Sequence, residues 1–223
     1  MQFYPLFLNL HNKEVLVVGG GAVGARKIAS LLMAEPQKIM VVEPAPGTAL
    51  APLLQNSCVH LACRPFQPED ILGKALVFAA TGNRQVNELV ADLCEARGIL
   101  CNSADNQEKS AFVVPAHFHN GPILAAIGTQ GASPALSRRL RQELEMWLDN
   151  RFTRLALVLG RLRPQLLAQG LPTEENTHIF RTLVNGPLAD LLHQGRFEEA
   201  RIYLATVLPE PLHPHVGDLL HEL

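Results

Sequence analysis

The 223-residue sequence lacks the features that define several common classes of protein. Lysine and arginine together number 19 against 21 aspartates and glutamates, so no excess of positive charge indicates a nucleic-acid-binding surface. No apolar run reaches the roughly 18 residues of a membrane-spanning helix, and the first residues lack the basic and apolar regions of a signal peptide. We therefore expect a soluble, cytoplasmic protein that binds neither nucleic acid nor membrane.

Cysteine is also scarce, and its pattern excludes the usual disulfide frameworks and zinc sites. No CxxC pair occurs, and the four cysteines all lie in apolar or strand-like surroundings: Cys58, Cys63, Cys94 and Cys101. We predict four buried, free thiols. Among nine histidines, two close pairs (His117 with His119, and His213 with His215) have no acid or cysteine at ligand spacing. The sequence therefore predicts no structural metal site.

Apolar residues, by contrast, make up 48% of the chain, and up to about residue 110 they form short runs that alternate with helical patterns. The runs predicted to be strands cover residues 14–18, 38–42, 58–62, 75–80 and 98–101. Helical spacing occupies residues 22–34 and the segment that ends at residue 97, and residues 47–55 also fit a helix. Short apolar strands that alternate with helices are typical of a parallel sheet covered on both faces. The predicted fold class is therefore α/β.

The pattern changes after residue 110. Apolar runs at 111–114 and 122–127 flank His119-Asn120-Gly121, which predicts an antiparallel hairpin. Ser133-Pro134 favours the start of a helix, because serine is a preferred N-cap and proline a preferred first helical residue. Leucines at helical spacing predict one continuous helix that Pro164 ends or kinks. At about 1.5 Å per residue this helix would be roughly 45 Å long, so we expect it to pack on another element or subunit. Residues 173–223 predict two or three further short helices.

The first strand leads directly into the loop Gly19-Gly20-Gly21-Ala22-Val23-Gly24, and a helix follows. In this GxGxxG pattern Gly19 permits a tight turn, Gly21 lets a pyrophosphate approach the backbone, and Gly24 lets the helix pack close to the strand. The N–H groups of Ala22 and Val23 open the helix, whose positive end favours phosphate. The order strand, loop, helix, strand supports a dinucleotide site over a simple glycine turn.

Two further loops are predicted to contact the dinucleotide. Glu43 ends the second strand, 24 residues after Gly19, where its carboxylate can accept hydrogen bonds from both ribose hydroxyls of NAD and would repel the 2′-phosphate of NADP. Pro44 follows it, and no arginine is near, so NAD is favoured. Thr81 and Gly82 follow the fourth strand at the carboxyl edge of the sheet, where ligands bind in such folds. The alternative for this second loop is a turn that caps the next helix.

Several segments resemble, in order and spacing, the N-terminal family of siroheme synthases. They are Tyr4-Pro5-Leu6-Phe7-Leu8; the glycine loop with its Ala25-Arg26-Lys27 continuation; Ala79-Ala80-Thr81-Gly82-Asn83 with Val86-Asn87; Cys101-Asn102-Ser103-Ala104-Asp105; Ala111-Phe112-Val113-Val114-Pro115-Ala116; and Gly131-Ala132-Ser133-Pro134-Ala135-Leu136. The segments are weak singly and specific together, over about residues 1–150. The C-terminal third is similar only as a helical appendage.

The resemblance implies a precorrin-2 dehydrogenase, which oxidises this tetrapyrrole to sirohydrochlorin with hydride transfer to NAD⁺, and in some members also a metal chelatase. It also implies a homodimer in which the segment after the nucleotide domain is exchanged between subunits. We therefore divide the chain into an NAD-binding Rossmann domain (1–112), a dimerisation segment (113–150) and a helical C-terminal domain (151–223). Two alternatives are a regulatory module that binds NAD without chemistry and a chelatase that does not oxidise.

Asp105 matches the key aspartate of the family, so the resemblance implies that it is the catalytic residue. A carboxylate there could take the proton that leaves with the hydride, or orient the ring; the alternative is a turn cap. The substrate carries several carboxylate arms, for which arginine forks are suited. The predicted substrate-binding residues are Asn102, Lys109, Thr129, Ser133 and Arg138, although the arginines could equally form a solvated helix face. Gly128-Thr129-Gln130-Gly131 departs from the serine-rich stretch of many relatives, and only the Thr129 hydroxyl is retained.

Overall fold

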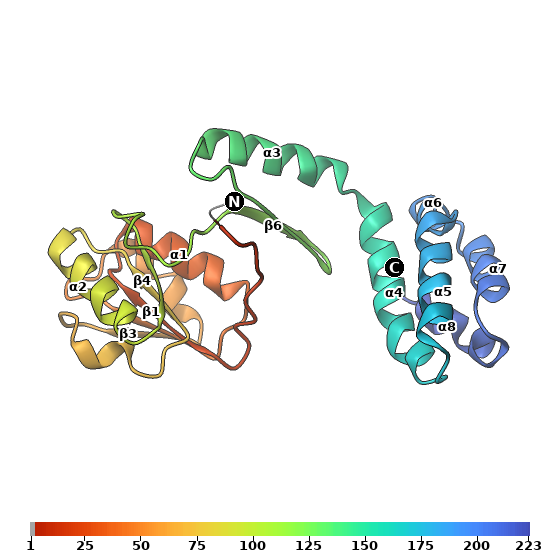
Figure 1. The fold of residues 1–223 in the computed structure, drawn as a ribbon, viewed down its shortest axis with the longest axis horizontal. Helices are drawn as coiled ribbons and strands as arrows, with labels where there is room; N and C mark the ends of the chain where they lie inside the picture. Colours follow the sequence, from red (N-terminus) through yellow and green to blue (C-terminus); the bar gives the residue numbers. More distant parts are fainter. Residues whose placement is uncertain (1–2) are drawn as a thin grey trace. The chain divides into compact units, whose positions relative to one another are not determined.

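The computed structural model describes residues 3–223, and the chain divides into two compact units with the boundary after Val114 (Figure 1). The first unit is a five-stranded parallel sheet in the order β3-β2-β1-β4-β5. Its strands are β1 (Glu14–Val18), β2 (Lys38–Val42), β3 (Val59–Ala62), β4 (Leu76–Ala79) and β5 (Leu100–Ser103). The predicted α/β fold with a Rossmann-type sheet is therefore confirmed.

Two helices cover the sheet, α1 (Ala22–Leu32) and α2 (Arg84–Glu95), one on each face. The central strand β1 is buried on both faces, because Val15 and Val17 pack on the α1 side while Leu16 and Val18 pack on the α2 side. This double burial explains why the strand is a continuous apolar run without polar alternation. The strand order reverses between β1 and β4, and the connections that leave their carboxyl ends turn to opposite faces of the sheet.

Two predictions for this unit are wrong in detail. Residues 47–55 form two short 3₁₀ turns, η1 (Thr48–Leu50) and η2 (Leu53–Gln55), since Pro52 has no N–H to continue a helix between them. A third 3₁₀ turn, η3 (Pro68–Ile71), precedes β4.

Only Cys94 and Cys101 are buried. Cys58 is half-buried, and Cys63 is exposed because it follows the end of the edge strand β3.

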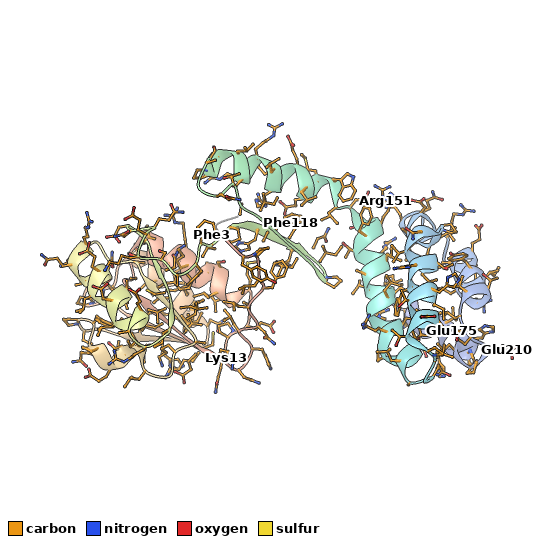
Figure 2. All side chains as sticks on the ribbon, viewed as in Figure 1. Phe3, Lys13, Phe118, Arg151, Glu175 and Glu210 are labelled. Atoms are coloured by element: carbon orange, nitrogen blue, oxygen red, sulfur yellow. The ribbon has the colours of Figure 1, made fainter. Side chains whose placement is uncertain are left out.

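The second unit begins with a hairpin of β6 (Ala116–Asn120) and β7 (Ile123–Ile127), and both strands contact α3 (Pro134–Trp147). Phe118 of β6, labelled in Figure 2, is buried. The hairpin was predicted correctly, but its first strand is not residues 111–114. That segment is held to the first unit, where the Ala111 N–H donates to the Cys101 carbonyl at 2.8 Å.

The predicted single long helix is in fact two helices, α3 and α4 (Asn150–Leu167). Leu148 leaves helical geometry, with φ −78° and ψ 74°, and the Asp149 side chain accepts a hydrogen bond from the Arg151 N–H at 2.8 Å. Asp149 is thus an N-cap that starts a new helix. Pro164 does not end α4, since it lies in the last turn, where its missing N–H removes a single helical hydrogen bond.

Helices α4 to α8 enclose a separate apolar core. The remaining elements are α5 (Thr173–Asn185), α6 (Leu188–His193), α7 (Phe197–Val207), a 3₁₀ turn η4 (Glu210–His215) and α8 (Val216–Leu219), which is more helices than predicted. The core is built from leucines at helical spacing, including the fully buried Leu162, Leu183 and Leu204. Within the described part of the chain, no helix is both long enough and apolar enough to cross a membrane.

Candidate functional site

The carboxyl ends of β1, β2 and β4 bring three predicted ligand-binding loops together. The Gly19 N–H donates to the Val42 carbonyl at 2.9 Å, which joins the glycine loop to the end of β2. A Cβ placed on Gly19 would lie 2.5 Å from the Ala80 carbonyl oxygen, so the same loop packs directly on the end of β4. The site therefore lies at the reversal of strand order, the usual ligand position in doubly wound sheets.

The three glycines of the motif have three different surroundings. Gly19 adopts a φ of +101°, which side chains rarely tolerate, and thus makes the tight turn. A Cβ on Gly24 would lie only 2.0 Å from the Gly19 carbonyl oxygen, so helix and loop could not pack as they do. A Cβ on Gly21 would meet nothing within 4 Å. Its backbone faces open space beside the N–H groups of Ala22 and Val23, which have no acceptor in the first turn of a helix.

Glu43 is oriented by the backbone of both neighbouring loops. Its Oε2 accepts a hydrogen bond from the Gly20 N–H at 2.7 Å and its Oε1 accepts one from the Ala45 N–H at 3.0 Å, while Pro44 between them is exposed. A carboxylate has about four acceptor positions, so two remain for hydroxyl groups. The glutamate therefore fixes the glycine loop and still presents acceptors beside it.

The loop after β4 is joined to α2 by hydrogen bonds between Thr81 and Asn87. The Thr81 N–H donates to Asn87 Oδ1 at 3.0 Å, and Asn87 Nδ2 donates to the Thr81 carbonyl at 3.0 Å. Asn87 is completely buried, so these bonds satisfy its amide. Asn83 also caps α2, since its side chain accepts from the Gln85 N–H. The loop is thus a helix cap, as in the alternative considered above, while Gly82 stays exposed at its tip.

Asp105 follows β5 and is exposed, with its carboxylate held by neighbours. Ser103 Oγ donates to Asp105 Oδ1 at 2.8 Å, and the nearby Asn87 amide also favours the charged form of the carboxylate. Partial burial raises the pKa of Asp105, but the polar side chains of Asn87 and Ser103 and the Arg84 guanidinium outweigh it and hold the pKa below its ordinary value. The group is therefore ionised at neutral pH, an acceptor fixed in direction and a weak base.

Sequence reasoning missed Asn87 and Ser103 as functional residues. Asn87 connects the Thr81 loop to Asp105, and Ser103 orients the carboxylate directly. Both residues stand inside the segments that carry the family resemblance. The available signal was a polar side chain on otherwise apolar elements: Asn87 on the inner face of α2, and Ser103 at the end of β5.

The predicted substrate residues of the first unit have partners within that unit. Asn102 is buried and its Nδ2 donates to the Phe112 carbonyl at 3.0 Å, so its amide anchors the chain after Asp105. Lys109 is exposed and forms an ion pair with Asp92 of α2. A substrate contact by either residue would have to be made with the remaining acceptor of Asn102 or the remaining donors of Lys109.

Three other predicted substrate residues belong to the second unit. Thr129 Oγ1 accepts a hydrogen bond from the Ser133 N–H at 3.1 Å and lies 3.1 Å from Ser137 Oγ. Ser133 is the N-cap of α3, as predicted, since its Oγ accepts from the Leu136 N–H. Arg138 is exposed, whereas the adjacent arginines 139 and 141 pair with glutamates one turn further along α3.

Metal-binding residues are not grouped in the described part of the chain. Within residues 3–223, no cluster of three or more histidine, cysteine, aspartate or glutamate side chains could hold an ion. His117 and His119 lie two residues apart in β6, and His215 lies 3.7 Å from Asp218. The chemistry that these residues offer is therefore dinucleotide binding with a nearby fixed carboxylate.

Comparisons with known proteins agree with this geometry. Residues 6–116 match a family of proteins described as putative NAD(P)-binding. The chain is 34% identical to the siroheme synthase of Nitrosomonas europaea over 93% of its length, and 35% identical to that of Thioalkalivibrio sulfidiphilus over 93%. It spans less than half of these relatives, 44% and 42% respectively.

One solved structure shares the fold of most of the chain. SirC, a precorrin-2 dehydrogenase, is 24% identical with a TM-score of 0.73, and the match covers 92% of this chain and 98% of SirC. At this identity the match establishes the fold. It includes residues of both units.

Proposed function

Because the chain belongs to the siroheme synthase N-terminal family, we propose that it is a cytoplasmic, NAD-dependent precorrin-2 dehydrogenase. In this reaction precorrin-2 loses a hydride and a proton and becomes sirohydrochlorin, while NAD⁺ is reduced to NADH. The observation that carries the proposal is the meeting of the glycine loop, the Thr81 loop and the fixed Asp105 carboxylate at adjacent strand ends.

The residues of the glycine loop fit a dinucleotide. Gly21 leaves space for a pyrophosphate, and the free N–H groups of Ala22 and Val23 can donate to it. Glu43 is preorganised by Gly20 to accept hydrogen bonds from a ribose, and its negative charge disfavours the 2′-phosphate of NADP. Bound NAD⁺ supplies the hydride acceptor. We therefore expect tighter binding of NADH than of NADPH.

Asp105 is the proposed catalytic residue. Its lowered pKa makes it a poor acceptor for a full proton, and its fixed direction suits a hydrogen bond from a pyrrole N–H. Such a bond would orient the ring and stabilise positive charge that develops as the hydride leaves. The proton that must also leave passes to solvent, and its loss completes sirohydrochlorin.

We also propose a homodimer in which residues 113–150 are exchanged, between a Rossmann domain at 1–112 and a helical domain at 151–223. The support is an unusual number of exposed apolar side chains on α3, of which Met146 is 75% and Trp147 59% exposed. Leu136 and Leu140 add to this face, and an exposed apolar patch is typical of an interface. A partner subunit would bring Thr129, Ser133 or Arg138 to the substrate.

The test is a coupled assay that follows NADH absorbance with enzymatically made precorrin-2. We expect NADH to form in step with sirohydrochlorin, and more slowly with NADP⁺. Asp105→Asn should lower kcat by about 10²–10³-fold, the usual cost of losing one electrostatic contact to a transition state, while the Kd for NADH stays within twofold. Formation of no NADH above the enzyme-free rate, or insertion of Fe²⁺ into sirohydrochlorin as the only activity, would exclude the dehydrogenase.

A further inference from the structure

Lys27 has surroundings that neither the glycine loop nor the Asp105 network explains. It lies one turn into α1 and is half-buried, and its Nζ lies 5.5 Å from the centroid of the Phe78 ring. Throughout residues 3–223, no carboxylate forms an ion pair with it or contributes to its electrostatic surroundings. Lys74, another half-buried lysine of this unit, pairs with Glu14.

A partly desolvated ammonium without an anion is unfavourable. Burial lowers the pKa of Lys27, and the neighbouring Arg26 guanidinium lowers it further. The face of one aromatic ring attracts a cation but offsets only part of the lost hydration. An anion bound from outside the chain would offset the remainder.

The position of the ammonium relates it to one half of the sheet. Phe78 belongs to β4, where it stands beside Val17 of β1 on one side and Asn102 of β5 on the other. The side chain of Lys27 therefore reaches from α1 across β1 toward the strands that lead to Thr81 and Asp105. Glu43, which would take the ribose, follows β2 on the opposite side of β1.

The Phe78 ring beneath the ammonium packs against a segment that is hydrogen-bonded to β5, the strand that precedes Asp105. The Phe112 ring meets Phe78 edge to face, with centroids 5.6 Å apart and planes at 82°. Phe112 is in turn fixed by the hydrogen bond from Asn102, three residues before Asp105. The Lys27 ammonium therefore lies over the Phe78 ring, and Phe112, from the segment that follows Asp105, packs against that ring.

We propose that Lys27 binds a carboxylate arm of the tetrapyrrole substrate. This assignment rests on the proposed function and names one point at which the polycarboxylate is held. A carboxylate fits better than the cofactor pyrophosphate, because Lys27 lies five residues beyond Ala22, about 7.5 Å further along the helix axis. Its Nζ lies over the Phe78 ring of β4.

The experiment measures binding without turnover, by fluorescence titration of sirohydrochlorin onto the NAD⁺-saturated full chain. Lys27→Met retains the length of the side chain and its packing on Phe78, and Lys27→Arg retains the charge. Lys13→Met is the matched control, since Lys13 is an exposed lysine at the opposite end of β1 (Figure 2). NADH titrations and thermal unfolding are recorded for every variant.

We expect Lys27→Met to weaken sirohydrochlorin binding at least tenfold, with Lys27→Arg within threefold and Lys13→Met within twofold of wild type. The Kd for NADH should stay within twofold throughout, and the Tm of Lys27→Met should equal or exceed that of wild type, because an unpaired charge is removed. Equal affinity of wild type and Lys27→Met for sirohydrochlorin overturns the proposal, and so does a parallel loss of NADH binding. Failure of the dehydrogenase itself is seen separately, as wild-type protein that forms no NADH from precorrin-2.

Discussion

The two units of the chain use their polar side chains differently. In the Rossmann unit, polar residues at strand ends bind one another across long stretches of sequence, as Gly20 does with Glu43 and Lys74 with Glu14. In the second unit most ion pairs join residues three or four apart in the sequence, such as Arg139 with Glu143. Pairs of the first kind fix the geometry of a site, whereas exposed pairs of the second kind contribute little to stability. The comparison indicates that long-range polar contacts fix the geometry of the first unit, whereas the helical core of the second unit is held by apolar packing.

The largest expected effect tests whether the helical core stands independently of the cofactor site. Leu204→Ala removes a fully buried side chain from α7 and should cost about 2–5 kcal/mol of the free energy of unfolding. Hydrogen-exchange mass spectrometry should show lost protection in α4 to α8 and unchanged protection in β1, β2 and β4. Ile202→Ala, at a 60% exposed position of the same helix, should stay within about 0.5 kcal/mol of wild type. Equal loss of protection in both units would contradict this separation.

The next largest effect is a difference in stability between two glycine-to-alanine substitutions, one in each unit. Gly24→Ala places a Cβ against the Gly19 carbonyl oxygen and should destabilise the protein by about 1–3 kcal/mol. Gly160→Ala, in an exposed and open part of α4, should instead stabilise it by up to about 1 kcal/mol, because alanine favours helix. Chemical denaturation measures both. If Gly160→Ala destabilised the protein, or if Gly24→Ala left its stability unchanged, the claim that close packing requires glycine at position 24 and not at position 160 would be wrong.

A smaller effect is expected from a substitution in the Rossmann unit that should weaken NADH binding without lowering the free energy of unfolding. Gly21→Ala meets nothing within 4 Å, so the free energy of unfolding should not fall. Its methyl group would occupy the space proposed for the pyrophosphate, and the Kd for NADH should rise at least tenfold, about 1.4 kcal/mol. Titration of NADH fluorescence provides the measurement. Unchanged NADH affinity would show that the phosphates lie elsewhere.

The smallest effect concerns the acid–base behaviour of Asp105. Ser103→Ala removes a hydrogen bond to the charged carboxylate, so the pKa of Asp105 should rise toward its ordinary value. The stabilisation that this depressed pKa provides is present above the unfolded-state pKa and is lost as pH falls through the folded pKa, and it should shrink in the variant. A ¹³C NMR titration of the Asp105 carboxyl reports the change. Ser137→Ala, a buried serine of the second unit, should leave that titration unaltered.

The sequence predicted the Rossmann unit better than the helical one, for physical reasons. Strands β1 and β2 were predicted to the residue, since each is an apolar run buried on both faces and bounded by glycine or charge. The break at Leu148 was missed because apolar spacing continues across it. Only Asp149, an N-cap residue inside a helical pattern, signalled a new start.

For the candidate site, the sequence predicted the conformation of the loops but not the side-chain contacts between elements. The turn at Gly19 and the close packing at Gly24 are local consequences of the glycine pattern and are confirmed. The hydrogen bonds between Asn87 and Thr81 join a helix to the strand end that precedes it, and the placement of Lys27 over Phe78 depends on strand order. Such contacts arise only when the sheet is assembled, so neither spacing nor residue type reveals them.

The strand order also determines when each edge of β1 acquires its partner strand during synthesis of the chain. Glu14 of β1 pairs with Lys38 soon after it is made, but the other edge of β1 waits for β4, where Val15 pairs with Leu76. At ~5–20 residues per second, ribosomal synthesis leaves that edge without its partner for a time on the order of seconds. An apolar strand with an open edge is a template for association with other chains, so nascent protein at this stage should depend on chaperones more than the finished fold does.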